Sequence, residues 1–169
     1  RSQKFLYNKN SFGTNLRLTE IQSVSGIEQL KELKKIQKKR ERMANDYFSI
    51  ISKYNKNIYC YKPPKNIKSA WYRFYFFIKS NNKKYNEIRF RIIKNLRKEG
   101  ITCFTGSCPE IYLERAFKSL KNFKLKRLKN CKILGNTSLA LDMNHTLTLS
   151  QHKKQLIKIN KNLNKIFNV

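Results

Sequence analysis

The sequence predicts an α/β (α+β) domain in which long helices flank a short sheet. Three observations support this fold class. Apolar residues recur at helical spacing in three long stretches, and the aromatic-rich segment 71–78 has the composition of a strand. Strand, helix and strand then follow one another within about 35 residues. With 169 residues, 40% of them hydrophobic, the chain is long enough for one domain with its own core.

The first helices are expected to follow an irregular lead-in segment, residues 1–18, which shows no sustained hydrophobic period. Thr19 and Gln22 have the spacing of a capping box, in which each side chain bonds the backbone of the other residue. Apolar residues then recur every three or four positions, with Lys and Arg on the opposite face. We therefore expect long connecting helices over residues 19–54, with a break near residues 30–33.

The next segment carries the first predicted strand. Two consecutive prolines within residues 55–68 favour a turn or loop, because the second forces the first out of the helical region. Residues 71–78 are mostly aromatic and lack a clean alternation, which suits a strand covered on both faces. Aromatic residues between cations are also typical of nucleic-acid stacking platforms. We favour a core strand, because Arg73 and Lys79 are the only charges nearby.

Residues 55–169 are predicted to form one small α/β domain, because no internal repeat or long linker divides them. Gly100 stands where a helix would end in a left-handed C-terminal cap. The predicted elements are a helix at 85–99, a strand at 101–104, helical segments at 112–120 and 123–134, a strand at 138–141 and a helix at 149–167.

The chain is strongly basic, with 38 Lys+Arg against 10 Asp+Glu and a formal net charge of +28. Lys, Asn and Ile are abundant while Gly and Ala are scarce, which is the bias of A/T-rich codons. A cationic surface spread over the whole fold therefore explains the charge better than a nucleic-acid-binding surface does. The run from Lys34 to Arg42 has two interpretations, a solvated helix face, which we favour, or a phosphate-binding stripe.

The sequence also predicts where the protein works. The longest strongly apolar run, 74–78, is far shorter than the roughly 20 residues of a membrane helix. The four cysteines form no Cys-x-x-Cys pair, and the two histidines are at no ligand spacing from them. We therefore expect no metal site, and reduced thiols in a cytoplasmic protein. Because the chain begins at Arg1 rather than Met, we interpret it as a piece of a longer protein.

The chain offers few groups for catalysis of its own. Its ten carboxylates are scattered, and none of the common phosphate-loop, dinucleotide, zinc-protease or serine-hydrolase motifs occurs. His145 as a base and Cys108 as a nucleophile both lack a suitable partner nearby in the sequence. We interpret both as structural or solvated residues and assign no catalytic residue within this chain.

The segment from Phe12 to Gln22 resembles the Gly-Tyr-Asn-Tyr-Arg-(Met/Leu)-(Ser/Thr)-(Asp/Glu)-Ile-Gln signature of the DegT/StrS sugar aminotransferases, with Thr14 and Leu16 in place of the two aromatics. Further segments are similar to that family in the same order: 26–33, 39–47, 70–78, 96–101, 106–112, 134–139 and 145–148. The resemblance implies the carboxy-terminal portion of a fold-type I enzyme. It would consist of long N-terminal helices and a small domain with a short, mainly antiparallel sheet and flanking helices.

The resemblance implies dependence on pyridoxal 5'-phosphate (PLP), held mainly by an upstream large domain that carries the Schiff-base Lys. This chain alone is therefore expected to be inactive. The implied reaction transfers an amino group from an amino acid, with glutamate as the expected donor, to a keto group of a nucleotide-linked sugar in polysaccharide biosynthesis. The implied assembly is a homodimer whose active site is shared across subunits, with no membrane and no specific nucleic acid as partner.

Three residues take functional roles through the resemblance. Asn15 is implied to donate its amide to the cofactor phosphate of the other subunit. Arg17 is implied to face the active-site mouth and pair with an anionic substrate, and Tyr112 to contact the substrate. On the residues alone, a turn cap for Asn15 and a surface ion pair between Arg17 and Glu20 remain open.

Two other functions remain open from the sequence. A basic nucleic-acid-binding module would use residues 71–77 for stacking and the face 34–42 for phosphates. A non-enzymatic remnant of the aminotransferase fold would keep the small domain as an interaction protein. We favour the carboxy-terminal part of a PLP-dependent sugar aminotransferase, because its segments occur in the family's order.

Overall fold

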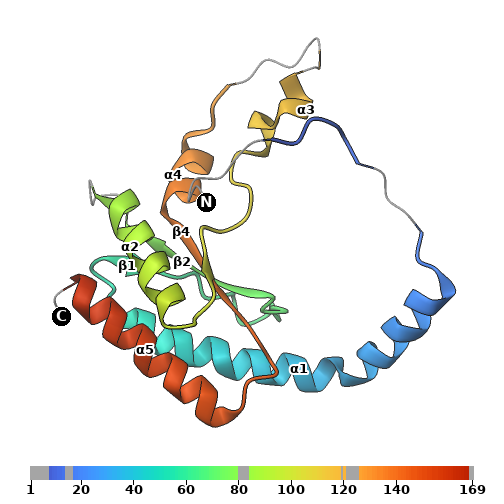
Figure 1. Ribbon diagram of the computed structural model, residues 1–169, viewed down its shortest axis with the longest axis horizontal. Helices are drawn as coiled ribbons and strands as arrows, with labels where there is room; N and C mark the ends of the chain where they lie inside the picture. The colour runs from blue at the N-terminus through green and yellow to red at the C-terminus, as the bar shows by residue number, and fades with distance from the viewer. Residues whose placement is uncertain (1–7, 14–16, 80–83, 119, 121–125, 168–169) are drawn as a thin grey trace.

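A four-stranded antiparallel sheet with the strand order β1-β2-β4-β3 forms the centre of the fold (Figure 1). The computed structural model describes residues 8–13, 17–79, 84–118, 120 and 126–167. Its strands are β1 (Ile58–Tyr59), β2 (Arg73–Ile78), β3 (Cys103–Phe104) and β4 (Ser138–Asp142). β2 and β4 form the long central pair, so residues far apart in the sequence hold the middle of the sheet together.

Helices enclose one face of this sheet. The helical elements are α1 (Glu20–Ser52), α2 (Tyr85–Lys98), the 3-10 turn η1 (Ile111–Leu113), α3 (Arg115–Lys118), α4 (Lys129–Thr137) and α5 (Leu149–Phe167). Buried residues of the C-terminal half of α1, of α2 and of α5 share one hydrophobic core with the strands. The observed architecture is therefore the α/β arrangement with a short antiparallel sheet that the sequence predicts.

The predicted core strand in the aromatic segment 71–78 is confirmed for residues 73–78, which form β2, but only one of its faces is fully covered. Phe74, Phe76 and Ile78 are buried, whereas the alternate residues of β2 are half buried. Successive side chains of a strand point to opposite faces of the sheet, so the three buried residues all face the helices. On the other face, Phe77 stacks on Tyr59 with ring centroids 5.2 Å apart.

α1 begins where the sequence predicts and continues without the predicted break. The Thr19 side chain accepts from the Gln22 backbone, and the Gln22 side chain accepts from the Thr19 backbone. The predicted break near residues 30–33 is wrong, because α1 is continuous for 33 residues. Ion pairs of Lys31 with Glu28 and of Lys35 with Glu32 connect successive turns across that stretch.

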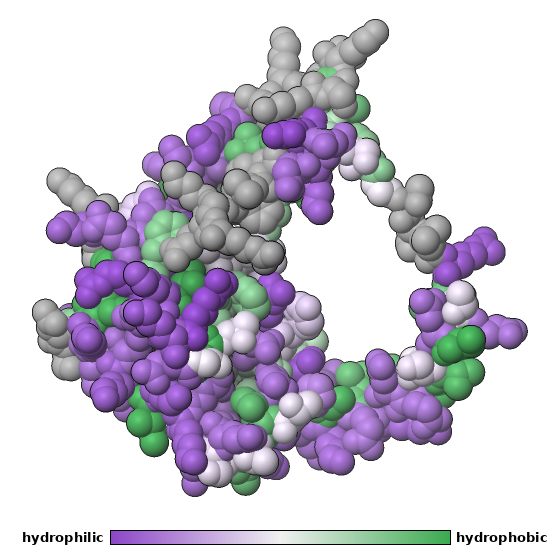
Figure 2. All heavy atoms as spheres, in the orientation of Figure 1, coloured by the Kyte–Doolittle hydropathy of each residue, from purple (hydrophilic) through white to green (hydrophobic). Residues whose placement is uncertain are grey.

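The N-terminal half of α1 projects away from the sheet with an apolar face exposed (Figures 1 and 2). The apolar residues on this face are Ile21, Val24, Ile27, Leu30 and Leu33, and Leu18 precedes them just before the helix; all six are 40–84% exposed. A stripe of this width at helical spacing normally packs against another surface. No helix of the described residues is long and apolar enough to cross a membrane.

The remaining elements follow the predictions in part. Helix α5 has the predicted limits, and Gly100 after α2 has the expected positive φ of 76°. The loop prediction for 55–68 is wrong at β1, because a strand of two residues is too short to show the alternation of apolar and polar residues. The predicted helix at 112–120 is two short pieces, η1 and α3, and the helix predicted at 123–134 is α4 at 129–137. Residues 121–125 lie outside the described residues, and the division at 18/19 and 54/55 stays a prediction.

Candidate functional site

Residues 8–13, at the start of the signature, run beside α3 in Figure 1 and are anchored there. The Lys9 backbone N–H donates to Glu114 Oε2 at 2.8 Å, and the Ala116 N–H donates to the Lys9 carbonyl at 2.7 Å. The Phe12 ring meets the Phe117 ring edge-on, with centroids 5.3 Å apart. These contacts fix the backbone a few residues before Asn15 and Arg17.

Glu114 is the centre of this anchor. Its side chain is buried, and its second oxygen accepts a hydrogen bond from the Cys108 thiol at 3.7 Å. Burial, followed by the charge of Glu114, raises the pKa of the Cys108 thiol, so the thiol stays protonated at neutral pH. Cys108 is thus a packed thiol that orients a carboxylate, and the part of the chain that the structure describes holds no metal-binding group of His, Cys, Asp and Glu.

Arg17 is open to ligands. Its side chain is exposed, and it forms no hydrogen bond or ion pair with any described residue. The surface ion pair with Glu20 that the sequence left open is therefore not formed. Arg17 lies two residues before the Thr19 cap of α1, so the backbone is held on both sides of it, at Phe12 and at Thr19. Asn15, the predicted phosphate ligand, lies outside the described residues.

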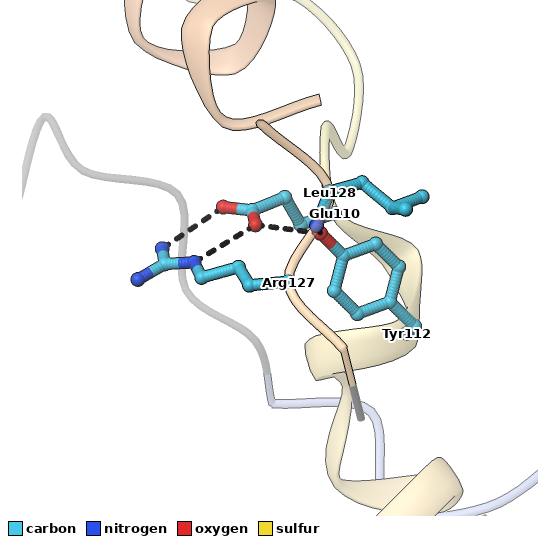
Figure 3. Close-up of polar contacts among 4 residues, drawn as sticks. All are labelled: Glu110, Tyr112, Arg127 and Leu128. Carbon is cyan, nitrogen blue, oxygen red and sulfur yellow. Dashed lines mark hydrogen bonds and ion pairs between the residues drawn. The ribbon is translucent and has the colours of Figure 1, made fainter. Parts of the chain in front are cut away.

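Tyr112 belongs to a polar cluster, which consists of Glu110, Tyr112, Arg127 and Leu128 (Figure 3). The Tyr112 hydroxyl donates to Glu110 Oε1 at 2.7 Å and accepts from the Leu128 N–H at 3.1 Å. Arg127 donates to both oxygens of Glu110, at 3.0 Å each. A substrate that used the Tyr112 hydroxyl would compete with these partners, and the predicted substrate contact of Tyr112 stays a prediction.

The structure does not bring the predicted site residues into one cluster. Within the described residues no contact joins Arg17 to Tyr112, although Lys9 and Phe12 contact Glu114 and Phe117, close in the chain to the polar cluster at Glu110 and Tyr112. Sequence reasoning missed Glu110, Glu114 and Arg127. The sequence holds only a weak signal for them: Glu110 and Glu114, two of only ten acidic residues in a basic chain, stand four positions apart.

The Glu110 carboxyl predicts a dependence of stability on pH. The hydrogen bonds from Arg127, more than the opposing effect of burial, lower the pKa of Glu110 from its ordinary value of 4.5. The ion pair therefore contributes its full stability above pH 4.5 and loses it as the pH falls through the lower pKa of the folded protein. Glu110→Gln should remove this part of the acid dependence of the free energy of unfolding, measured by urea titration between pH 7 and about pH 3.

The matched control is Glu87→Gln, which removes an exposed carboxylate at the start of α2. Its unfolding profile should keep the acid dependence of the unmodified protein. If the free energy of unfolding of the two variants depends on pH in the same way, the ion pair of Glu110 and Arg127 does not contribute the predicted stability.

Several aminotransferases of known structure share this fold. The aminotransferase from Psychrobacter cryohalolentis is 30% identical, with a TM-score of 0.79 over 99% of this chain and 44% of its own. Helicobacter pylori PseC, an aminotransferase involved in the biosynthesis of pseudoaminic acid, is 26% identical, with a TM-score of 0.72 over 92% of this chain and 40% of its own. The PLP-form of Spr1654 from Streptococcus pneumoniae, a putative sugar aminotransferase, shares the fold at 18% identity, with a TM-score of 0.71 over 88% of this chain and 36% of its own.

The fold is thus that of part of an aminotransferase, and the chain spans less than half the length of each of these structures. The chain belongs to the DegT/DnrJ/EryC1/StrS aminotransferase family, whose model matches residues 1–159. This is a PLP-dependent family, and the resemblance read from the signature at 12–22 is confirmed. A comparison with curated proteins found no match. Neither alternative function, nucleic-acid binding or a non-enzymatic remnant, is favoured by these findings.

Proposed function

We propose that these residues form the carboxy-terminal part of a PLP-dependent aminotransferase. The reaction we propose moves an amino group from an amino acid, with glutamate as the donor, to a keto group of a nucleotide-linked sugar. The observation that carries the proposal is the family match over residues 1–159, which includes the signature as well as the small domain. We propose that the cofactor is bound mainly by a large domain that carries the Schiff-base Lys, and that the 169 residues alone are inactive.

The residues near the signature fit the phosphate end of PLP. A Cβ at Gly13 would meet nothing within 4 Å beyond its chain neighbours, and the Arg17 guanidinium is unpaired among the described residues. A phosphate group at the signature would therefore have space beside Gly13 and a charged donor at Arg17. When bound, PLP supplies the carrier for the transferred amino group. Every other role proposed here belongs to residues of this chain.

In the proposed enzyme, Asn15 donates its side-chain amide to the cofactor phosphate of the partner subunit, which makes dimerisation a condition of activity. Arg17 binds the carboxylate of the amino donor or the charged part of the sugar substrate, because a guanidinium can donate two parallel hydrogen bonds to an anion. The contacts of Lys9 and Phe12 with α3 hold the backbone in place for both residues. The exposed apolar half of α1 packs against the large domain.

Substitutions at the signature test this proposal in the full-length protein. Asn15→Ala should weaken PLP binding about tenfold, because a hydrogen bond to a charged group is lost. Arg17→Ala should raise the KM of a substrate by a similar factor and leave PLP affinity unchanged, whereas Arg17→Lys should restore only part of the loss because it cannot form the paired hydrogen bonds. PLP affinity is read from the cofactor absorbance, and activity from 2-oxoglutarate formed from glutamate.

Arg91→Ala, at an exposed position of α2, is the matched control and should change neither quantity. An unchanged PLP affinity in Asn15→Ala would remove the phosphate role from Asn15. If glutamate yields no 2-oxoglutarate with any nucleotide-linked keto sugar, the proposed reaction is wrong.

A further inference from the structure

A cavity of about 680 Å³ lies between the middle of α1 and the turn that leads into α5. One wall is formed by α1 between Lys31 and Asp46, and the other by residues 147–149 and His152. The buried Met43 and the half-buried Leu147 supply apolar surface between the charged groups. A cavity of this size, with apolar surface and a few polar groups, has the dimensions of a small-molecule site.

The charge of this cavity is strongly positive. Its lining contains two carboxylates, Glu32 and Asp46, and six cationic side chains: Lys31, Lys34, Lys35, Lys38, Lys39 and Arg42. Lys31 pairs with Glu28 and Lys35 with Glu32, at exposed positions on α1. The other four cations form no ion pair with any described residue.

The two carboxylates leave this excess of positive charge uncompensated. Glu32 is already paired with Lys35, and Asp46 Oδ2 lies 3.0 Å from Nε2 of the buried His152. Lys34, Lys38 and Arg42 follow one another at intervals of four residues, so neighbouring like charges repel along one face of α1. A bound anion would relieve this repulsion.

The opposite wall adds to the positive potential. α5 begins at Leu149 with a reciprocal cap, in which the Thr148 N–H donates to the Gln151 side chain and the Gln151 N–H donates to the Thr148 hydroxyl. The N-terminus of a helix carries a partial positive charge from its aligned peptide dipoles. Two elements that are distant in the sequence therefore direct positive charge into one cavity.

We propose that this cavity binds a small phosphorylated molecule that carries at least two negative charges. Lysines dominate its lining, and Lys binds phosphate as a point charge, whereas carboxylates are recognised best by paired donors of Arg. The cavity begins about 17 Å along α1 from Glu20, and the proposal does not depend on the aminotransferase reaction.

Isothermal titration calorimetry of the full-length protein with inorganic tripolyphosphate at 150 mM NaCl tests the proposal. One site per chain is expected, with affinity at least tenfold weaker in Lys34→Gln/Lys38→Gln. The control is Lys94→Gln/Lys98→Gln, which removes two exposed lysines, four residues apart, from α2. It should change the affinity less than twofold. Arg42→Gln is a second variant at the cavity and should also weaken binding, and far-ultraviolet circular dichroism checks that α1 is retained.

Equal losses in the cavity pair and the control pair would show that binding follows net charge alone, and would overturn the proposal. A single-stranded oligonucleotide that binds more tightly than tripolyphosphate, and depends on the same two lysines, would also overturn it, because the surface would then serve a nucleic acid. The absence of tripolyphosphate binding in the unmodified protein would overturn it directly.

Discussion

Replacing Phe74 with alanine is expected to lower the free energy of unfolding by about 3–5 kcal/mol, the usual cost of removing a fully buried aromatic side chain. Phe74 is 0% exposed and joins α1 to the sheet. Its ring centroid lies 5.2 Å from that of Tyr47, 5.0 Å from that of Phe48 and 6.1 Å from that of Trp71. Alanine would leave a cavity among three rings that cannot collapse without moving α1.

Urea unfolding measures this loss with a probe at the site, because Trp71 is the only tryptophan of the chain and packs on Phe74 and Phe48. Phe77→Ala is the matched control in the same strand. Phe77 is half buried on the other face and stacks on Tyr59, so its loss should cost only about 1–2 kcal/mol. A cost at Phe74 no larger than at Phe77 would contradict the assignment of the core face.

Local signals explain which elements the sequence predicts well. The start of α1 depends on a reciprocal bond between Thr19 and Gln22, three residues apart. The start of α5 depends in the same way on Thr148 and Gln151. The end of α2 depends on Gly100, because the left-handed conformation there favours glycine. Each of these signals lies within a few consecutive residues, so it can be recognised in the sequence without knowledge of the tertiary fold.

Elements that depend on distant partners escape sequence analysis. β1 has two residues and exists because Ile58 and Tyr59 pair with Ile78 and Phe77. The predicted break near residues 30–33 is wrong, because ion pairs of Lys31 with Glu28 and of Lys35 with Glu32 connect successive turns of α1 through that stretch.

The candidate site likewise has features that the sequence predicts and features that only the fold creates. The signature gives Arg17 a role by resemblance, and the structure adds that its guanidinium is unpaired among the described residues. Tyr112 also has a role by resemblance, but its hydroxyl is bonded to Glu110 and Leu128, which no motif shows. The anchoring carboxylate of Glu114 bonds a residue 105 positions away, a contact that only the fold creates.

Gly135→Ala is expected to destabilise the protein, although helix propensity alone predicts the opposite. Gly135 lies within α4, where alanine is normally about 1 kcal/mol more favourable than glycine. A Cβ at this position would lie only 2.2 Å from Cβ and 2.6 Å from Cγ of Pro109. The proline ring cannot rotate away, and Glu110 of the polar cluster follows it directly in the chain.

Moving α4 instead of Pro109 would be equally costly. The Gly135 carbonyl accepts a hydrogen bond at 2.6 Å from the buried Arg89 guanidinium. A shift of α4 would weaken this hydrogen bond and leave the buried charge of Arg89 less well compensated. We expect a net loss of about 1–3 kcal/mol on urea unfolding. Gly26→Ala is the control, because Gly26 lies within α1 and a Cβ there would meet nothing within 4 Å outside the helix itself. This substitution should raise the free energy of unfolding by about 0.4–1 kcal/mol. Stabilisation by both substitutions would show that α4 and Pro109 are not in close contact in solution.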